Sequence, residues 1–391
     1  MLIGYKYRIY PNDKQKELFA KTFGCVRFIY NKMLNDKIEH YKSTQQTLNV
    51  TPAKYKEEFL WLKEVDSLAL CNAQLNLQSA YNNFFRTKKG FPKFKSKKNK
   101  QSYITNNQGN NIRIENKKIK LPKIGFVKIK QHREFKGIIK SVTVSKSLTN
   151  KYFVSILVDT EYKSKVKETE NKIGLDLGVK DVVVDSSGNK IKNPKFLQKH
   201  EKNLKKKQKS LSRKKKGSNN YEKERVKLAK IYEKLTNARK DFLHKLSSTI
   251  TNENQVIIVE DLSVKSMIEN SDSSNITKSI TDVSISELLR QLEYKVKWNN
   301  RVLVKIDKYF PSSQTCSSCG FINKNVKNLS VRTWKCPNCK VIHDRDINAA
   351  KNILREGINK INKTAGTAGL ACVNLSSMDI EQEAHQALAC G

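Results

Sequence analysis

The stretch IGLDLGVKDVVVDSSG, residues 173–188, is the most informative part of this 391-residue chain. Its apolar residues predict a buried strand, a tight turn and a second strand that closes at Ser-Ser-Gly. Asp176 lies among apolar neighbours in the first of these strands. Burying a lone carboxylate is costly unless a cation or a hydrogen-bond partner offsets the cost. Asp176 is therefore a candidate metal ligand, and the alternative is an ordinary aspartate that caps a turn.

Two further acids stand in comparable places. Glu260 ends VIIVE (256–260), a strand by its β-branched content, and Asp346 lies at the start of the amphipathic helix predicted over 344–356. Acids at the ends of neighbouring strands and at the start of a packed helix can converge on one point. Magnesium prefers a few carboxylates with waters and a substrate phosphate, and two such ions suit in-line phosphodiester cleavage. Asp176, Glu260 and Asp346 are thus the predicted catalytic Mg²⁺ ligands, with two ions expected. Asp344 and Asn348 lie close enough to assist.

Four of the eight cysteines form two CxxC pairs. Cys316 and Cys319 make the first pair, and Cys336 and Cys339 make the second. Four thiolates close a tetrahedral structural zinc site and leave no coordination position open for a substrate. The pattern predicts a zinc ribbon that serves folding, with redox pairs as the weaker alternative. His343 is a further potential ligand, but four cysteines already suffice.

Charge is the strongest bulk property of the chain. Lysine and arginine number 76 against 37 acidic residues, which gives a formal net charge of +39. Such a charge favours a polyanionic partner, because neutralised phosphates release condensed counterions. Residues 195–216 are the most basic stretch, and residues 86–100 interleave Phe91 and Phe94 with lysines. A solvated helix face is the alternative for the first stretch, whereas exposed phenylalanines in the second favour contact with nucleic-acid bases.

The rest of the chain divides into segments with different patterns of apolar and polar residues. Residues 2–9 alternate like a strand, 10–87 hold three helical patterns, and strand-like runs follow at 111–121, 125–130, 138–146 and 151–160. These features suggest a small β-barrel with a helical block inserted after its first strand. Residues 195–248 predict a long helical region with a coiled-coil-like seam, and residues beyond 357 predict a loosely ordered tail. No stretch is apolar enough to span a membrane, and the sequence predicts a cytoplasmic protein without a membrane partner.

Several motifs together resemble the TnpB family, the transposon-encoded RNA-guided nucleases related to type V CRISPR effectors. The resemblance runs from about residue 3 to residue 357 and rests on the following segments: YRIYPNDKQ (7–15), CVRFIYN (25–31), FPKFKSK (91–97), IGLDLGVKD (173–181), VIIVEDLSV (256–264), YFPSSQTCSSCG (309–320) and CPNCKVIHDRDINAAKNI (336–353).

The resemblance implies a mixed α/β fold with a specific domain order. A wedge-like β-barrel would comprise residues 1–10 and 88–165, with a helical recognition lobe at 11–87. A RuvC-like nuclease domain of the RNase H fold would follow at 166–357, with a helical insertion at 195–248 and a zinc ribbon at 311–342. Residues 358–391 would form the tail. The family's three acids match Asp176, Glu260 and Asp346.

The resemblance also implies the activity and the partners. The protein is expected to hold a guide RNA from the transposon end and to hydrolyse double-stranded target DNA beside a short adjacent motif. Two alternatives stay open from the sequence. The first is an RNA-independent RuvC-type transposase or resolvase, and the second is a guide-dependent DNA-binding repressor that does not cleave.

Overall fold

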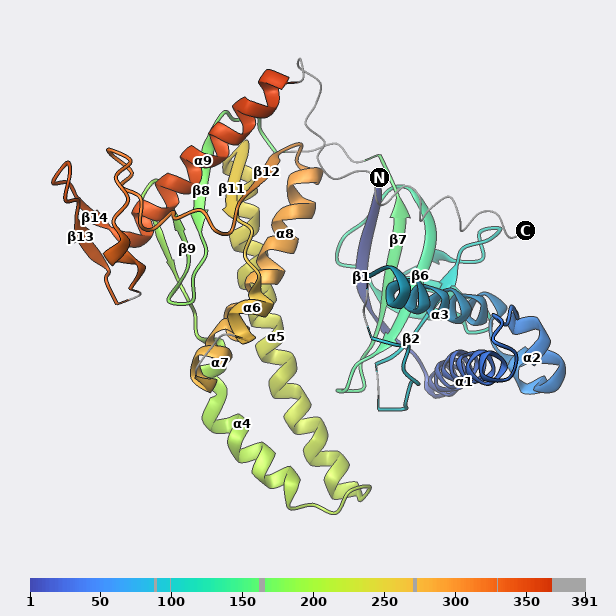
Figure 1. The fold of residues 1–391 in the computed structure, drawn as a ribbon. Helices are drawn as coiled ribbons and strands as arrows, with labels where there is room; N and C mark the ends of the chain where they lie inside the picture. Colours follow the sequence, from blue (N-terminus) through green and yellow to red (C-terminus); the bar gives the residue numbers. More distant parts are fainter. Residues whose placement is uncertain (88–89, 99, 162–165, 270–272, 329, 368–391) are drawn as a thin grey trace. The chain divides into compact units, whose positions relative to one another are not determined.

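The computed structural model of the protein describes residues 1–87, 90–98, 100–161, 166–269, 273–328 and 330–367. The chain divides into two compact units (Figure 1). Residues 1–162 and 207–233 build the first unit, and residues 163–206 and those from 234 onward build the second. Among the described residues, no helix combines the length and the apolar character that crossing a bilayer requires.

The first unit begins with a strand, continues with helices and ends in a run of strands. Its elements are β1 (Leu2–Tyr10), α1 (Asp13–Thr44), α2 (Pro52–Glu58), the 3₁₀ helix η1 (Leu60–Glu64), α3 (Ser67–Thr87), β2 (Gln101–Asn106), β3 (Arg113–Glu115), β4 (Lys118–Leu121), β5 (Gly125–Lys130), β6 (Ile138–Lys146) and β7 (Tyr152–Asp159).

The strands of the first unit form one curled antiparallel sheet in the order β2-β6-β7-β1-β5-β4-β3. The sequence predicted a barrel, but no pairing between the edge strands β2 and β3 closes the sheet within the described residues. The chain turns between these two strands at Asn107, whose side chain accepts a hydrogen bond from the N–H of Ile112 at 2.8 Å. This turn sends β3 to the opposite edge of the sheet instead of alongside β2.

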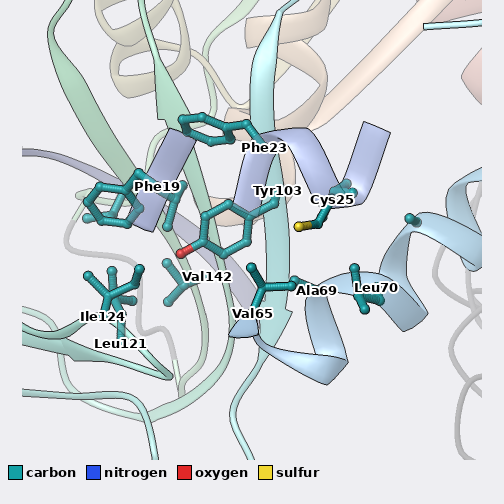
Figure 2. Packing of buried hydrophobic residues seen from close by; sticks show 14 of the residues in the cluster. Phe19, Phe23, Cys25, Val65, Ala69, Leu70, Tyr103, Leu121, Ile124 and Val142 are labelled. Carbon is teal, nitrogen blue, oxygen red and sulfur yellow. The ribbon is translucent and has the colours of Figure 1, made fainter. Parts of the chain in front are cut away.

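Helix α1 is a single helix of 32 residues, although its sequence predicted two helical patterns. Asn12 caps it and exchanges hydrogen bonds with Gln15 in a capping box. Its apolar stripe packs against the sheet and α3, and Figure 2 shows Phe19 and Phe23 of α1 around Tyr103 of β2. Helices α2 and η1 were missed by the three helical patterns predicted over 10–87.

The second unit contains a five-stranded mixed sheet among its described residues and a small ribbon, and the helical hairpin formed by residues 196–253 is divided between the two units. The elements from residue 172 onward are β8 (Lys172–Asp176), β9 (Asp181–Asp185), β10 (Lys190–Lys192), α4 (Phe196–Ser212), α5 (Asn219–Glu253), β11 (Val256–Glu260), α6 (Val264–Glu269), α7 (Ser274–Val283), α8 (Ile285–Trp298), β12 (Val302–Ile306), the 3₁₀ helix η2 (Lys324–Lys327), β13 (Thr333–Lys335), β14 (Ile342–Asp344) and α9 (Arg345–Thr367).

The sheet of the second unit has the order β10-β9-β8-β11-β12, with β8, β11 and β12 parallel. Side chains on one face, including Leu175, Ile257 and Val259, pack with residues of α5 and α8. Ile258 lies on the other face and packs with Ile353 of α9. The strands therefore have helices on both sides, which explains why they read as continuous apolar runs.

Two predictions about helix boundaries are corrected by the structure. The helical region predicted over 195–248 is interrupted after α4, where the chain turns at Gly217 in a left-handed conformation (φ +87°). The tail predicted from residue 358 is helical as far as Thr367, because Ile358 continues the apolar stripe of α9 against the sheet. Residues 368–391 of that predicted tail lie outside the described residues.

Candidate metal centres

Asp176 and Glu260 lie side by side at the ends of two paired strands. Strands β8 and β11 run parallel, and their last paired residues are Leu175 and Val259. The two acids follow directly, so their Cβ atoms are expected about 5 Å apart. Because side chains alternate between the faces of a sheet, both acids point to the face opposite Leu175 and Val259. That face is the one covered by α9.

Two glycines allow α9 to lie directly on this face. A Cβ atom on Gly174 would collide with the backbone of α9 and would lie 2.6 Å from the N atom of Leu354. A Cβ on Gly357 would lie 2.6 Å from Cδ1 of Ile258 on β11. A Cβ on Gly174 would also meet the carbonyl oxygen of Ala350. Asp346 precedes Ala350 by four residues, which is about one turn of the helix. Asp346 is thus on the sheet-facing stripe of the helix, near the ends of β8 and β11.

The pKa of Asp176 shows that the charges of the three acids interact. The pKa of Asp176 is raised to about 7, mainly by burial and in addition by the negative charges of Glu260 and Asp346. Arg345 and Arg332 act against this shift. A carboxyl group with this pKa is ready to lose its proton when a cation arrives.

The other two acids have one polar partner each in this neighbourhood. Ser312 donates a hydrogen bond from Oγ to Oε1 of Glu260 at 2.6 Å. Burial raises the pKa of Glu260, and the Ser312 bond opposes this. Nη1 of Arg332 lies 3.6 Å from Oδ2 of Asp346. Both carboxylates therefore keep oxygen atoms that could bind a cation.

Asp344 starts the helix that carries Asp346. Its Oδ1 accepts hydrogen bonds from the backbone N–H groups of Asp346 and Ile347, each at 3.1 Å. Its Oδ2 accepts from Nζ of Lys190 at 2.6 Å. Both carboxylate oxygens of Asp344 are therefore engaged in hydrogen bonds. Asp344 caps α9 and fixes the start of this helix.

A cavity of about 840 Å³ opens beside the acids within the second unit. Asp176 and Asp346 line it together with basic residues that include Lys180, Lys195 and Arg332. Glu260 is not among its lining residues. A lining that holds both carboxylates and basic side chains suits a ligand that carries phosphate groups and bound divalent cations.

The four predicted cysteines gather at a single point. The Sγ atoms of Cys316, Cys319, Cys336 and Cys339 all lie within 4.8 Å of one another. The Sγ–Sγ distances from Cys316 to Cys339 and from Cys319 to Cys336 are both 3.6 Å. A tetrahedron of thiolates around zinc has sulfur atoms about 3.8 Å apart, given Zn–S bonds of about 2.3 Å. The arrangement therefore fits a structural zinc ion and no disulfide.

Both cysteine knuckles are built by the same backbone pattern. In the first, the N–H of Gly320 donates to the carbonyl of Cys316 at 2.9 Å, and in the second the N–H of Lys340 donates to that of Cys336 at 3.0 Å. Gly320 and Lys340 both have positive φ, +79° and +64°. A hydrogen bond from the backbone N–H of Phe321 lowers the pKa of Cys319 to about 6, which favours the thiolate.

His343 lies against this cluster, with Nε2 3.0 Å from Sγ of Cys316. Its ring also packs against Trp334 of β13, with ring centroids 4.9 Å apart. Within the described residues, the four cysteines are the only compact group of metal-ligating side chains. The three acids, although electrostatically coupled, are not gathered as tightly.

Sequence reasoning missed three polar residues around the acids. Ser312 contacts Glu260, Arg332 contacts Asp346, and Asn352 supports the segment that carries Ser312. One pattern could have revealed the last of these, since Asn348 and Asn352 stand four residues apart on one side of the amphipathic helix predicted over 344–356. Ser312 and Arg332 lie in loops, where no periodic pattern points to a partner.

The two basic stretches singled out from the sequence lie on exposed surfaces. Most side chains of 195–216 are exposed, and Leu204 is the buried residue of α4. Phe91 and Phe94 are 46% and 53% exposed. Phe91 packs edge-to-face on Phe84 of α3, with ring centroids 5.3 Å apart, so it is partly covered by the protein itself.

The fold and the cysteine cluster define a mixed α/β protein with the fold of a CRISPR effector. The solved structure of a Cas12f1–sgRNA–target DNA complex matches with a TM-score of 0.59 and 14% sequence identity, over 90% of this chain and 98% of the other. A family model described as a "Cas12f1-like, TNB domain" matches residues 286–353, which include all four cysteines.

Sequence comparison gives the family. A model described as a "Probable transposase" matches residues 155–271, and a helix-turn-helix model matches residues 1–46, which here form β1 and the single helix α1. A "Putative RNA-guided DNA endonuclease" of Streptomyces pristinaespiralis is 36% identical over 91% of this chain and 89% of its own length. InsQ of Escherichia coli K12, which has the same description, is 30% identical over 98% and 97%. The chain belongs to the TnpB family.

Proposed function

We propose that the protein is a transposon-encoded RNA-guided DNA endonuclease and that Asp176, Glu260 and Asp346 form its active site. The main support is geometric. Two acids end adjacent parallel strands and face the helix whose first turn carries the third. The electrostatic coupling of Asp176 to both other acids agrees with this grouping. The names of the relatives from Streptomyces pristinaespiralis and Escherichia coli support the same activity.

The donor set suits magnesium. Three carboxylates in a partly buried site repel one another, and hard divalent cations with oxygen ligands remove that repulsion. When bound, one or two Mg²⁺ ions would stabilise charge on the oxygens of the scissile phosphodiester. Lys180, Lys195 and Arg332 line the neighbouring cavity and could hold backbone phosphates of the strand. The acid cap formed by Asp344 fixes Asp346 at the start of α9.

The remaining parts of the chain are proposed to have the following roles. Residues 166–357 would be a RuvC-like nuclease domain of the RNase H fold, consistent with the sheet order β10-β9-β8-β11-β12 flanked by helices. The curled sheet and the helices at 11–87 would grip the guide RNA and read a short motif beside the target. The four cysteines would hold a structural Zn²⁺ ion.

Cleavage with and without RNA tests this function. We expect the protein purified with its RNA to cut duplex DNA that matches the guide, only when Mg²⁺ is present. Protein stripped of RNA should not cut. Equal cutting by stripped protein would instead indicate an RNA-independent RuvC-type enzyme. Guide-dependent DNA binding by the wild type without any cutting would indicate a repressor.

The substitution Asp176→Ala tests the site itself. It should reduce cutting by about 10³-fold or more while DNA binding changes little, since basic side chains provide the binding. Asp241→Ala is a matched control, because Asp241 is an exposed acid of the same unit whose Oδ2 lies 2.8 Å from Nζ of Lys245 on the helix surface. Unchanged cutting by Asp176→Ala would remove Asp176 from the active site.

A further inference from the structure

Glu260 is contacted by a segment that leads directly into the zinc knuckle. The chain forms a tight turn from Pro311 to Thr315, in which the N–H of Thr315 donates to the carbonyl of Pro311 at 3.0 Å. Ser312 lies in this turn and is 7% exposed. Its hydroxyl donates to Glu260 at 2.6 Å, and Cys316 follows one residue after the turn. One short segment thus touches a proposed catalytic acid and carries a proposed zinc ligand.

Two buried asparagines of α9 hold this turn in place. Asn352 donates from Nδ2 to the carbonyl of Ser312 at 2.8 Å. Asn348 donates from Nδ2 to the carbonyl of Thr315 at 2.7 Å and accepts from the N–H of Ser317 at 2.8 Å. Asn348 and Asn352 are 1% and 0% exposed. Buried amides are costly unless they are hydrogen-bonded, so these bonds fix the turn relative to α9.

Arg355 lies on the same face of α9 as Asn348 and Asn352 and adds two hydrogen bonds. Its Nη2 donates to Oδ1 of Asn352 at 2.8 Å, and its Nη1 donates to the carbonyl of Ser317 at 3.3 Å. Asn348, Asn352 and Arg355 are spaced by four and three residues and therefore share one side of α9. The opposite side of the helix carries Ala350 and Gly357 against the sheet. One face of α9 therefore packs on the sheet beside the proposed acid site, and the opposite face holds the turn and the first cysteine knuckle.

We propose that Ser312 is a positioning residue that holds the carboxylate of Glu260 in one orientation, and that Asn348 and Asn352 make this orientation depend on the zinc-ordered first knuckle. The inference rests on the proposed function, because it assigns Glu260 to the divalent-cation site. Hydrogen bonds to a ligating carboxylate orient it, and losing such a partner typically costs about 10–100-fold in metal affinity or activity.

The test uses the full-length, zinc-loaded chain with two substitutions at residue 312. Ser312→Ala removes the hydroxyl, and Ser312→Thr keeps it. Binding of Mn²⁺ is measured by calorimetry on the RNA-free chain, together with zinc content and melting temperature. Cleavage by the guide-loaded complex is measured across Mg²⁺ concentrations. We expect Ser312→Ala to keep its zinc and its melting temperature, to bind Mn²⁺ about 10-fold or more weakly, and to need correspondingly more Mg²⁺ for cleavage.

Ser312→Thr should restore Mn²⁺ affinity and the Mg²⁺ requirement to within about threefold of the wild type, since the donor is retained. A packing role would give a different result, in which both variants lose melting temperature together. That result, or normal Mn²⁺ affinity in Ser312→Ala, would overturn the inference. Asn352→Asp has no N–H donors for the Ser312 carbonyl and is expected to weaken Mn²⁺ binding in the same way.

Glu260→Gln separates this inference from the proposed function. If Glu260→Gln cuts DNA like the wild type, the proposed active site is wrong whatever Ser312 does. If Glu260→Gln is inactive while Ser312→Ala behaves normally, the active site stands and only the positioning role fails.

Discussion

The cysteine cluster and the three acids are both candidate metal-binding groups, but they are built on opposite principles. The four thiols already lie within 4.8 Å of one another, and the two knuckles repeat the same backbone hydrogen bonds. The three acids are less tightly gathered, and their mutual repulsion contributes to raising the pKa of Asp176 to about 7. The backbone thus holds the cysteine thiols close together, whereas the three acids bring negative charges that repel one another into a partly buried place.

The residues that surround the cysteines also differ from those that surround the acids. The cysteines are packed with Val326 and Trp334 in a small core of their own. Asp176 and Asp346 border a cavity that Lys180, Lys195 and Arg332 also line. A closed site with all ligands supplied by protein serves folding, whereas an open site that costs stability is typical of function. The difference predicts that damage to the first site is seen mainly in stability and damage to the second mainly in activity.

The largest effect is expected from Cys336→Ser. Cys336 is fully buried, and losing one thiolate should abolish stoichiometric zinc binding and unfold the ribbon, since structural zinc contributes about 10 kcal/mol or more of apparent binding free energy. Zinc content by atomic emission and protease sensitivity between β12 and α9 would measure this. Cys71→Ser is the control, because Cys71 is an exposed free cysteine of the first unit.

The comparison would break if Cys336→Ser lost its zinc yet kept the ribbon protected from protease and cleaved DNA at the wild-type rate. Zinc would then contribute neither to folding nor, through the turn at Ser312, to the acid site.

A smaller effect is expected from Gly174→Ala, which alters the acid site without touching an acid. The added methyl group would collide with the backbone of α9, and such overpacking costs about 1–3 kcal/mol. Because α9 carries Asp346, its displacement should lower the cleavage rate as well as the melting temperature, while zinc content stays normal. Gly4→Ala is the matched control, since a Cβ there meets nothing within 4 Å. Normal cleavage by Gly174→Ala would mean that the position of Asp346 on the sheet is unimportant.

Much of this architecture could be predicted from the sequence because the informative patterns are local. The CxxC spacing predicts the cysteine cluster, the apolar run that ends in Asp176 predicts strand β8, and the β-branched run that ends in Glu260 predicts strand β11. The family motifs added the order of the parts, and family membership is confirmed by the comparisons with known relatives.

Other features depend on contacts between distant segments and leave no local pattern. The curled sheet was predicted as a barrel because alternation identifies strands but not which edges pair. The break between α4 and α5 was missed because lysines continue the helical composition up to Gly217. Ser312 and Asn352 acquire their importance only when α9 is folded against the turn that precedes Cys316.

The last expected effect is the dependence of stability on pH, which tests the stored charge directly. The pKa of Asp176 is about 7 in the folded protein and near 3.9 in an unfolded chain. The folded state therefore holds a proton that the unfolded state has lost between about pH 4 and pH 7. Stability should fall as the pH rises through this window and stay level above it. Mg²⁺ should restore part of the loss at pH 8, because a cation favours the ionised carboxylate.

Asp176→Asn removes the titrating group and should flatten this profile. The variant and the wild type should melt at similar temperatures below about pH 4, where Asp176 is neutral in both the folded and the unfolded state, and the variant should melt higher at pH 8 by about a few degrees. Added Mg²⁺ should raise the melting temperature of the wild type at pH 8 more than that of the variant. If the two proteins instead melted in parallel at every pH, the acid site would not store charge, and its contrast with the cysteine site would reduce to the choice of ligand atoms.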